Sequence, residues 1–140
     1  MAHNGQTVTD EVALRLVVPG DDGLMLRATL RYQPSDPYAI EATFRAADES
    51  ISWVLGRDLL SEGLDSPTGQ GDVRVWPAAR RGTERALVMI MLQSPDGQAT
   101  LALDAVDLDT FLLRTYQAVP QGQESRHVDI DTVIASLLGR

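Results

Sequence analysis

The chain has 140 residues, with 20 acidic and 12 basic side chains, a net charge of −8 at pH 7 and no cysteine. This length fits one domain with its own hydrophobic core, and the lack of cysteine excludes thiolate catalysis, cysteine zinc sites and disulfides. The acidic charge disfavours nucleic-acid binding, because that affinity depends on positive side chains that neutralise phosphates. The apolar runs are too short to span a bilayer, so we expect no direct membrane insertion.

The first half of the chain has the pattern of an antiparallel meander. Residues 1–10 are polar and aperiodic, which predicts a flexible tail before a single domain over residues 11–140. Alternating apolar residues then predict three antiparallel strands, over residues 12–18, 24–32 and 38–46. A short strand over residues 49–55 and a brief helix over residues 56–64 follow, and residues 66–71 are predicted to form a loop rich in Pro and Gly.

The second half begins with another meander. A strand starts at Val73, and two more are predicted over residues 85–93 and 98–104, joined by a turn that contains Pro95. The strand from Ala86 to Leu92 has apolar residues on both faces, so both faces must be covered. One face can be covered by the core of the same chain, and the other requires a second packed sheet or another subunit, which favours an oligomer. The alternative interpretation is an ordinary interior strand that its own chain covers on both faces.

Two helices are predicted to complete an α+β domain of two antiparallel meanders packed with helices. The first begins near Asp104 or Asp107 and stops at Pro120, because apolar residues recur at helical spacing between them. The second is capped by Asp129 or Asp131 and places an apolar stripe on one face before Gly139 ends the helix.

The sequence contains no pattern typical of an enzyme. The two histidines, His3 and His127, lack the spacing of a metal site or a catalytic triad, and we interpret both as surface residues. The two tryptophans, Trp53 and Trp76, are expected to pack in the core rather than to stack on bases, and a position at a protein interface is the alternative for either of them. We therefore expect no catalytic residues, no metal and no cofactor.

Several segments resemble the SsgA-like proteins, which control sporulation-specific cell division in filamentous actinobacteria. These segments occur in the same order as in that family and cover residues 31–40, 53–64, 71–77, 94–99 and 111–124. The resemblance implies a Whirly-like fold, a homotrimer and no catalysis. It also implies a cytoplasmic regulator at the division septum that helps to recruit and position FtsZ through protein contacts, with other SsgA-like proteins as further candidate partners.

Five residues are candidates for partner binding. The exposed arginines are candidates because arginine is enriched at interface hot spots, and the loop after the predicted helix is a candidate because Pro and Gly fix its shape. The candidates are Arg80, Arg81, Arg114, Gly122 and Glu124. The alternative hypothesis is a single-stranded nucleic-acid-binding protein of Whirly type, for which the best evidence in the sequence is Arg27, Arg31 and Arg45.

Overall fold

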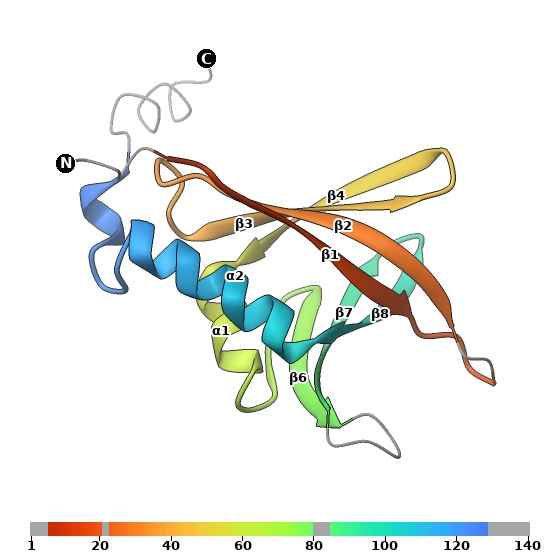
Figure 1. Cartoon of the computed structure of the whole chain (residues 1–140). Coiled ribbons are helices and arrows are strands. Elements are labelled where there is room, and N and C mark those ends of the chain that lie inside the picture. Colours follow the sequence, from red (N-terminus) through yellow and green to blue (C-terminus); the bar gives the residue numbers. More distant parts are fainter. Residues whose placement is uncertain (1–5, 21–22, 80–84, 129–140) are drawn as a thin grey trace.

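The sheet is a single antiparallel layer of eight strands that curls strongly around two helices (Figure 1). The computed structural model describes residues 6–20, 23–79 and 85–128. The strand order is β4-β3-β2-β1-β8-β7-β6-β5, so each half of the sheet is a meander of strands that are consecutive in the chain. The predicted α+β class is confirmed.

The strands have the following bounds. The first meander contains β1 (Val8–Leu16), β2 (Leu24–Tyr32), β3 (Ala39–Ala46) and β4 (Glu49–Gly56). The second contains β5 (Thr68–Gln70), β6 (Val73–Ala79), β7 (Ala86–Ser94) and β8 (Gly97–Asp104). The helices are α1 (Arg57–Gly63), α2 (Ala105–Ala118) and a short 3₁₀ turn, η1 (Glu124–Arg126).

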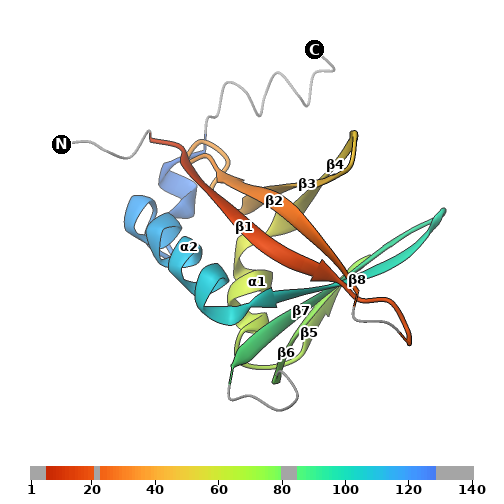
Figure 2. The same ribbon diagram turned by 45° about the vertical axis from the view of Figure 1, so that its right-hand side comes forward.

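The two meanders are not separate sheets, because β1 pairs with β8. Only three residue pairs form this junction, and Leu14 opposite Leu103 is one of them. Figures 1 and 2 show the two halves of the sheet diverging from this junction, with α1 and α2 in the angle between them. One curled sheet can therefore enclose a core with helices on one side only.

Three predictions about the elements need correction or stay open. The first strand begins at Val8, so the predicted tail over residues 1–10 is wrong for its last three residues. The loop predicted over residues 66–71 contains the short strand β5, which pairs with β6. The helix predicted after Asp129 lies outside the described residues.

The core lies between the inner face of the sheet and one face of α2. This helix begins at Ala105, and its cap is Asp104, one of the two predicted positions. The Asp104 side chain accepts a hydrogen bond of 3.0 Å from the Val106 N–H. Its buried face consists of Leu108, Phe111, Leu112 and Thr115. Figure 2 shows this helix running along the inner side of the sheet.

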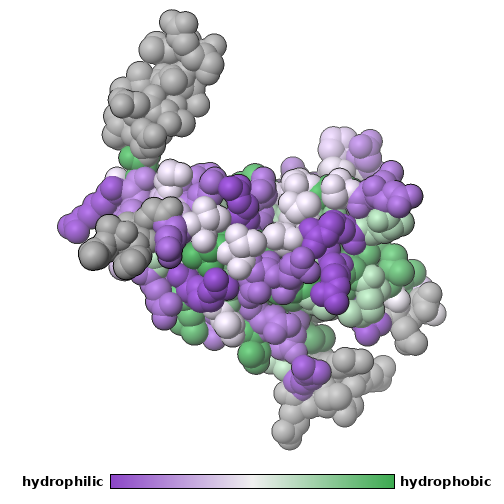
Figure 3. Space-filling view, turned by 45° about the horizontal axis from the view of Figure 1, so that its top comes forward, coloured by the Kyte–Doolittle hydropathy of each residue, from purple (hydrophilic) through white to green (hydrophobic). Residues whose placement is uncertain are grey.

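The outer face of the sheet has a polar half and an apolar half. The polar half lies on β1 to β4, where hydrophilic side chains predominate and hydrophobic ones gather towards one end (Figure 3). The apolar half lies on β6 to β8, where Leu87, Met89 and Met91 are only half-buried, whereas their inward-facing neighbours on β7 are buried. An open groove of about 810 Å³ runs over this half. Its lining combines apolar residues, among them Met25, Leu87 and Met89, with the charged residues Arg15, Arg85, Asp104 and Asp107.

The two tryptophans lie on opposite faces of the sheet. Trp53 is half-buried and packs against the core, as predicted. Trp76 pairs with Met89 across the β6–β7 ladder and therefore lies on the outer, apolar face. The expectation of core packing is wrong for Trp76, because alternate side chains of a strand point to opposite faces and its neighbour Val75 is buried on the inner face.

Candidate functional site

Arg57 is the most unusual residue of the structure, because a full-length arginine side chain is only 1% exposed. It is the first residue of α1 and follows the last residue of β4 directly. Its backbone N–H donates to the Tyr38 carbonyl at 2.8 Å, which fixes the point where the strand becomes a helix. The side chain is thereby directed beneath the end of α2.

The Arg57 guanidinium binds the C-terminal end of α2 and the segment that follows it. One terminal nitrogen donates to the carbonyls of Thr115 at 3.1 Å and Val119 at 2.8 Å. The other forms a buried ion pair of 2.9 Å with Glu124. The last carbonyls of a helix lack partners within the helix, so a cation placed there is electrostatically favourable.

Two tyrosine rings enclose the guanidinium. Its central carbon lies 4.1 Å from the centre of the Tyr116 ring and 5.0 Å from that of Tyr32, which permits cation–π attraction to both. The Tyr32 hydroxyl donates to the Pro37 carbonyl at 3.0 Å, and burial raises the pKa of Tyr32 to about 12. We call Tyr32, Arg57, Thr115, Tyr116 and Glu124 the Arg57 cluster.

Glu124 connects this cluster to the loop before it. Its second carboxylate oxygen accepts a hydrogen bond of 2.8 Å from the Gly122 N–H. Hydrogen bonds from its own backbone N–H and then from Arg57 lower the pKa of Glu124, although burial opposes this effect. Gly122 has a φ of 90°, a conformation that a residue with a side chain rarely adopts, so this loop has one defined shape.

The cluster can hold surface loops in place but has no reacting group exposed to solvent. Its charged groups are buried and bonded to each other, and it joins α1, α2, residues 33–38 and residues 119–126. The tips of these two loops are exposed, and Tyr38 is 53% exposed. The cluster is therefore a rigid support for a surface, which is what a binding site for a protein needs.

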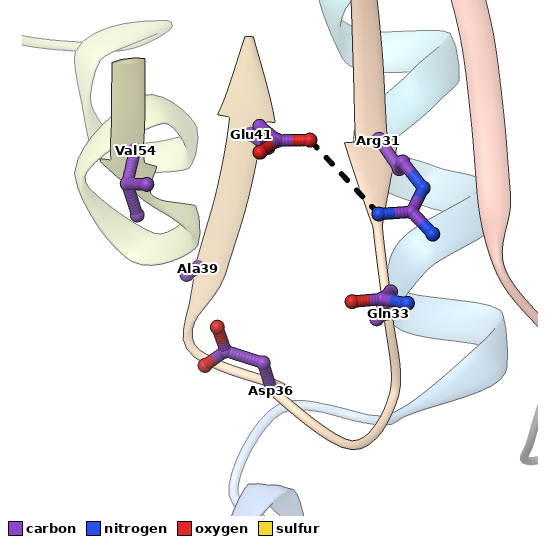
Figure 4. A pocket seen from close by; sticks show the side chains of 6 residues that line it. All are labelled: Arg31, Gln33, Asp36, Ala39, Glu41 and Val54. Carbon is purple, nitrogen blue, oxygen red and sulfur yellow. Dashed lines mark ion pairs between the residues drawn. The ribbon is translucent and has the colours of Figure 1, made fainter. Parts of the chain in front are cut away.

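A small pocket of about 90 Å³ lies beside the first of these loops (Figure 4). It is lined by Arg31, Gln33, Asp36, Ala39, Glu41 and Val54. Arg31 and Glu41 face each other across it as a loose ion pair of 3.9 Å, and Asp36 projects from the loop below. The pocket thus has two carboxylates and one guanidinium, with the apolar Val54 at its rim.

Of the predicted binding residues that the structure describes, Arg114 lies apart from Gly122 and Glu124. Arg80 and Arg81 lie outside the described residues. Arg114 is on the exposed side of α2, 3.9 Å from Asp10, and does not join the Arg57 cluster. Gly122 and Glu124 do belong to one unit, but Glu124 is buried, so its contact is with Arg57 rather than with an exposed partner surface.

The three arginines that supported the nucleic-acid-binding hypothesis each form an ion pair with a glutamate. Arg27 and Arg45 lie 3.8 and 3.3 Å from Glu11, and Arg31 lies 3.9 Å from Glu41. All three arginines lie on the outer face, because Arg27 and Arg31 are four residues apart on β2 and Arg45 is directly opposite Arg27 on β3. Their positive charge is largely compensated locally, which weakens the case for phosphate binding.

The described part of the chain offers no metal site and no membrane helix. It contains no group of three His, Asp or Glu side chains that is able to hold a metal ion. No helix in residues 6–20, 23–79 and 85–128 has the length and apolar character required to cross a bilayer.

Arg57 was not among the predicted site residues, although its position in the sequence carries a signal. Arg57 and Asp58 interrupt an apolar run between Leu55 and Leu59, at a point where a strand pattern changes to a helix pattern. An arginine in such a position is either at an exposed strand end or buried with partners. Which of the two applies here depends on the partners that Arg57 finds between Thr115 and Glu124, and these residues are distant from it in the sequence.

Comparisons with known proteins give the same family as the sequence motifs. The family described as "Streptomyces sporulation and cell division protein, SsgA" matches residues 26–124. The chain belongs to the SsgA family. This match includes Tyr32, Arg57, Tyr116 and Glu124, so the Arg57 cluster lies within the part of the chain that defines the family.

Relatives in this family match over nearly the whole chain. The sporulation-specific cell division protein SsgB of Streptomyces coelicolor is 50% identical over 133 residues, which is 94% of this chain and 96% of the relative. SsgB of Thermobifida fusca is 46% identical over 139 residues, 99% of both chains. These likenesses support a role in cell division.

Solved structures show that the fold is shared. A structure from work on SsgB mutations that correlate with longitudinal cell division during sporulation of Streptomyces coelicolor has a TM-score of 0.83 at 50% identity, and the alignment covers 91% of this chain and 99% of that one. A crystal structure of an SsgA-like sporulation-specific cell division protein from Thermobifida fusca has a TM-score of 0.85 at 44% identity, covering 98% and 99%.

Proposed function

We propose that the chain is a non-enzymatic regulator that helps to recruit and position FtsZ at sporulation septa, in the cytoplasm, through protein contacts. The observation that carries the proposal is the near-full-length likeness to sporulation-specific cell division proteins. The structure adds two supporting features. The buried charges of Arg57 and Glu124 are paired with each other, although Arg57 Nε has no hydrogen-bond partner among the described residues, and this pair connects exposed loops to α2.

A polymerising partner favours binding by many weak contacts. One small surface on each subunit gives modest affinity, whereas several linked copies bind a filament much more tightly by avidity. The outer face of β6 to β8 offers a surface for such linkage, because Trp76, Leu87, Met89 and Met91 are half-buried there beside an open groove. We therefore propose a homotrimer of Whirly-like subunits that associate through this face.

Association through this face predicts a mass about three times that of one chain in multi-angle light scattering at micromolar concentration. Met89→Glu should lower the mass, because it places a charge on the apolar face without disturbing the buried side of β7. Gln98→Glu, at the exposed β7–β8 turn, is the matched control and should keep the parent mass. A monomeric parent protein at high concentration would contradict this prediction.

The function itself predicts co-sedimentation with FtsZ. The protein should pellet with nucleotide-assembled FtsZ and stay in the supernatant when nucleotide is omitted, because many subunit contacts require a polymer. Filter binding of single-stranded DNA at two salt concentrations should show weak retention at both. The proposal fails if the protein stays in the supernatant with polymer, and strong, salt-sensitive DNA retention would favour the nucleic-acid alternative.

A further inference from the structure

The strand β4 is an edge of the sheet along its whole length, since it pairs with β3 on one side and with no described strand on the other. One hydrogen bond shows which backbone N–H and C=O groups of β4 point towards β3 and which point away from the sheet. The Arg57 N–H donates to the Tyr38 carbonyl, so alternate residues before it also direct their backbone groups towards β3. The N–H and C=O groups of Ser50, Ser52 and Val54 therefore point away from the sheet.

This edge lacks the features that usually prevent pairing with another strand. Natural edge strands are short, kinked, or protected by proline or inward-facing charges. β4 has eight residues, contains neither proline nor lysine, and exposes apolar side chains on both faces, with Ile51 59% and Val54 66% exposed. The first meander projects in Figure 1, with β4 along its open side.

The acidic pocket of Figure 4 lies next to this edge. Val54 forms its rim, and Asp36 and Glu41 supply two negative charges against the one positive charge of Arg31. A strand added to β4 would lie about 4.8 Å away and place every second side chain on the same face as Val54. A lysine or arginine of that strand has the length to lay its carbon chain over Val54 and direct its charge into the pocket.

We propose that β4 binds an extended, basic segment of the division partner by strand addition, with a lysine or arginine over Val54 in the acidic pocket. This inference rests on the proposed function. A second copy fits less well, because β4 from Glu49 to Gly56 contains no basic residue to meet the pocket's carboxylates. The surface is also separate from the apolar face assigned to self-association, since β4 and β6 lie towards opposite edges of the sheet.

The test compares Val54→Pro with Val54→Thr in co-sedimentation with FtsZ polymer. Proline removes the outward N–H but no bond to β3, so the fold should survive while affinity for the polymer falls by about tenfold, the value of one or two hydrogen bonds. Threonine keeps the N–H and should bind like the parent. Glu41→Gln should weaken binding several-fold and make it less salt-sensitive, whereas Glu11→Gln, on the same face but outside the pocket, should not.

Hydrogen exchange on the parent protein provides a readout that does not depend on a variant folding. Binding to FtsZ polymer should slow exchange at the amides of Ser50, Ser52 and Val54. Parent-like binding by folded Val54→Pro, or unchanged exchange along β4 in the complex, would overturn the inference and leave the proposed function intact. A loss of oligomer mass in Val54→Pro with normal FtsZ binding would assign the edge to a second copy and also overturn it. Absence of binding by the parent would overturn both proposals.

Discussion

Arg57→Met should destabilise the protein by about 3 to 5 kcal/mol, because removing one partner leaves the buried Glu124 carboxylate without its counter-charge. The carbonyls of Thr115 and Val119 lose their donors at the same time. A loss of this size is a large part of the stability of an ordinary domain. Urea unfolding followed by circular dichroism measures it directly.

Arg114→Met is the matched control for this change. Arg114 lies on the exposed side of α2, and exposed ion pairs contribute about 0 to 1 kcal/mol, so its replacement should have little effect. The double variant Arg57→Met with Glu124→Met should lose less than the two single variants together, because no buried charge is left unpaired. Equal unfolding of Arg57→Met and the parent would show that the cluster does not support the fold.

The same ion pair predicts a dependence on pH. Because the pKa of Glu124 is lowered in the folded protein, its contribution is complete above the ordinary glutamate pKa of about 4.3 and is lost as the pH falls through the lower folded value. Glu124→Gln should therefore be less stable than the parent at neutral pH, and the difference should shrink in acid. A difference that stays constant down to about pH 3 would exclude this role for the carboxylate.

Phe111→Ala should cost about 3 to 5 kcal/mol, the range for emptying a buried aromatic site. Phe111 is 0% exposed and lies on the face of α2 that packs against the sheet, so the surrounding side chains cannot fill the space without moving the helix. The variant should melt far below the parent or fail to fold.

Leu113→Ala is the comparison for Phe111→Ala within the same helix. Leu113 is 56% exposed, and its truncation should change stability by less than about 0.5 kcal/mol. If the two variants melt at the same temperature, the buried face of α2 has been assigned wrongly. A large effect of Leu113→Ala alone would instead point to a subunit contact on the outer side of the helix.

Local patterns were sufficient to predict most elements of this fold. Alternation of apolar residues identified every strand except the short β5, and helical spacing after Asp104 identified α2 together with its cap and its buried Phe111. These features depend on residues within one strand or one turn of helix, so they can be recognised without the tertiary structure. The family motifs likewise indicated the cell division family.

The pairing of β1 with β8 was not predictable from such patterns. The paired residues Leu14 and Leu103 are 89 positions apart in the sequence, and either strand has a sequence that suits any antiparallel neighbour. The burial of Arg57 was hidden for the same reason, since its partner Glu124 is 67 residues away. The charges of Arg27 and Arg45 likewise suggested a basic face until the sheet placed Glu11 beside both.

The sequence by itself determined the element types, the apolar strand β7, the lack of cysteine chemistry and the family, because each depends on residue identity or short spacing. The tertiary structure alone decided that one curled sheet forms from two meanders, that Glu124 is a buried counter-charge rather than a surface contact, and that β4 is an open edge. Each of these properties depends on which segments that are distant in sequence come into contact. The free energy of such contacts comes from the burial of apolar surface and from hydrogen bonds and ion pairs between the segments, and a local sequence pattern contains no information about either.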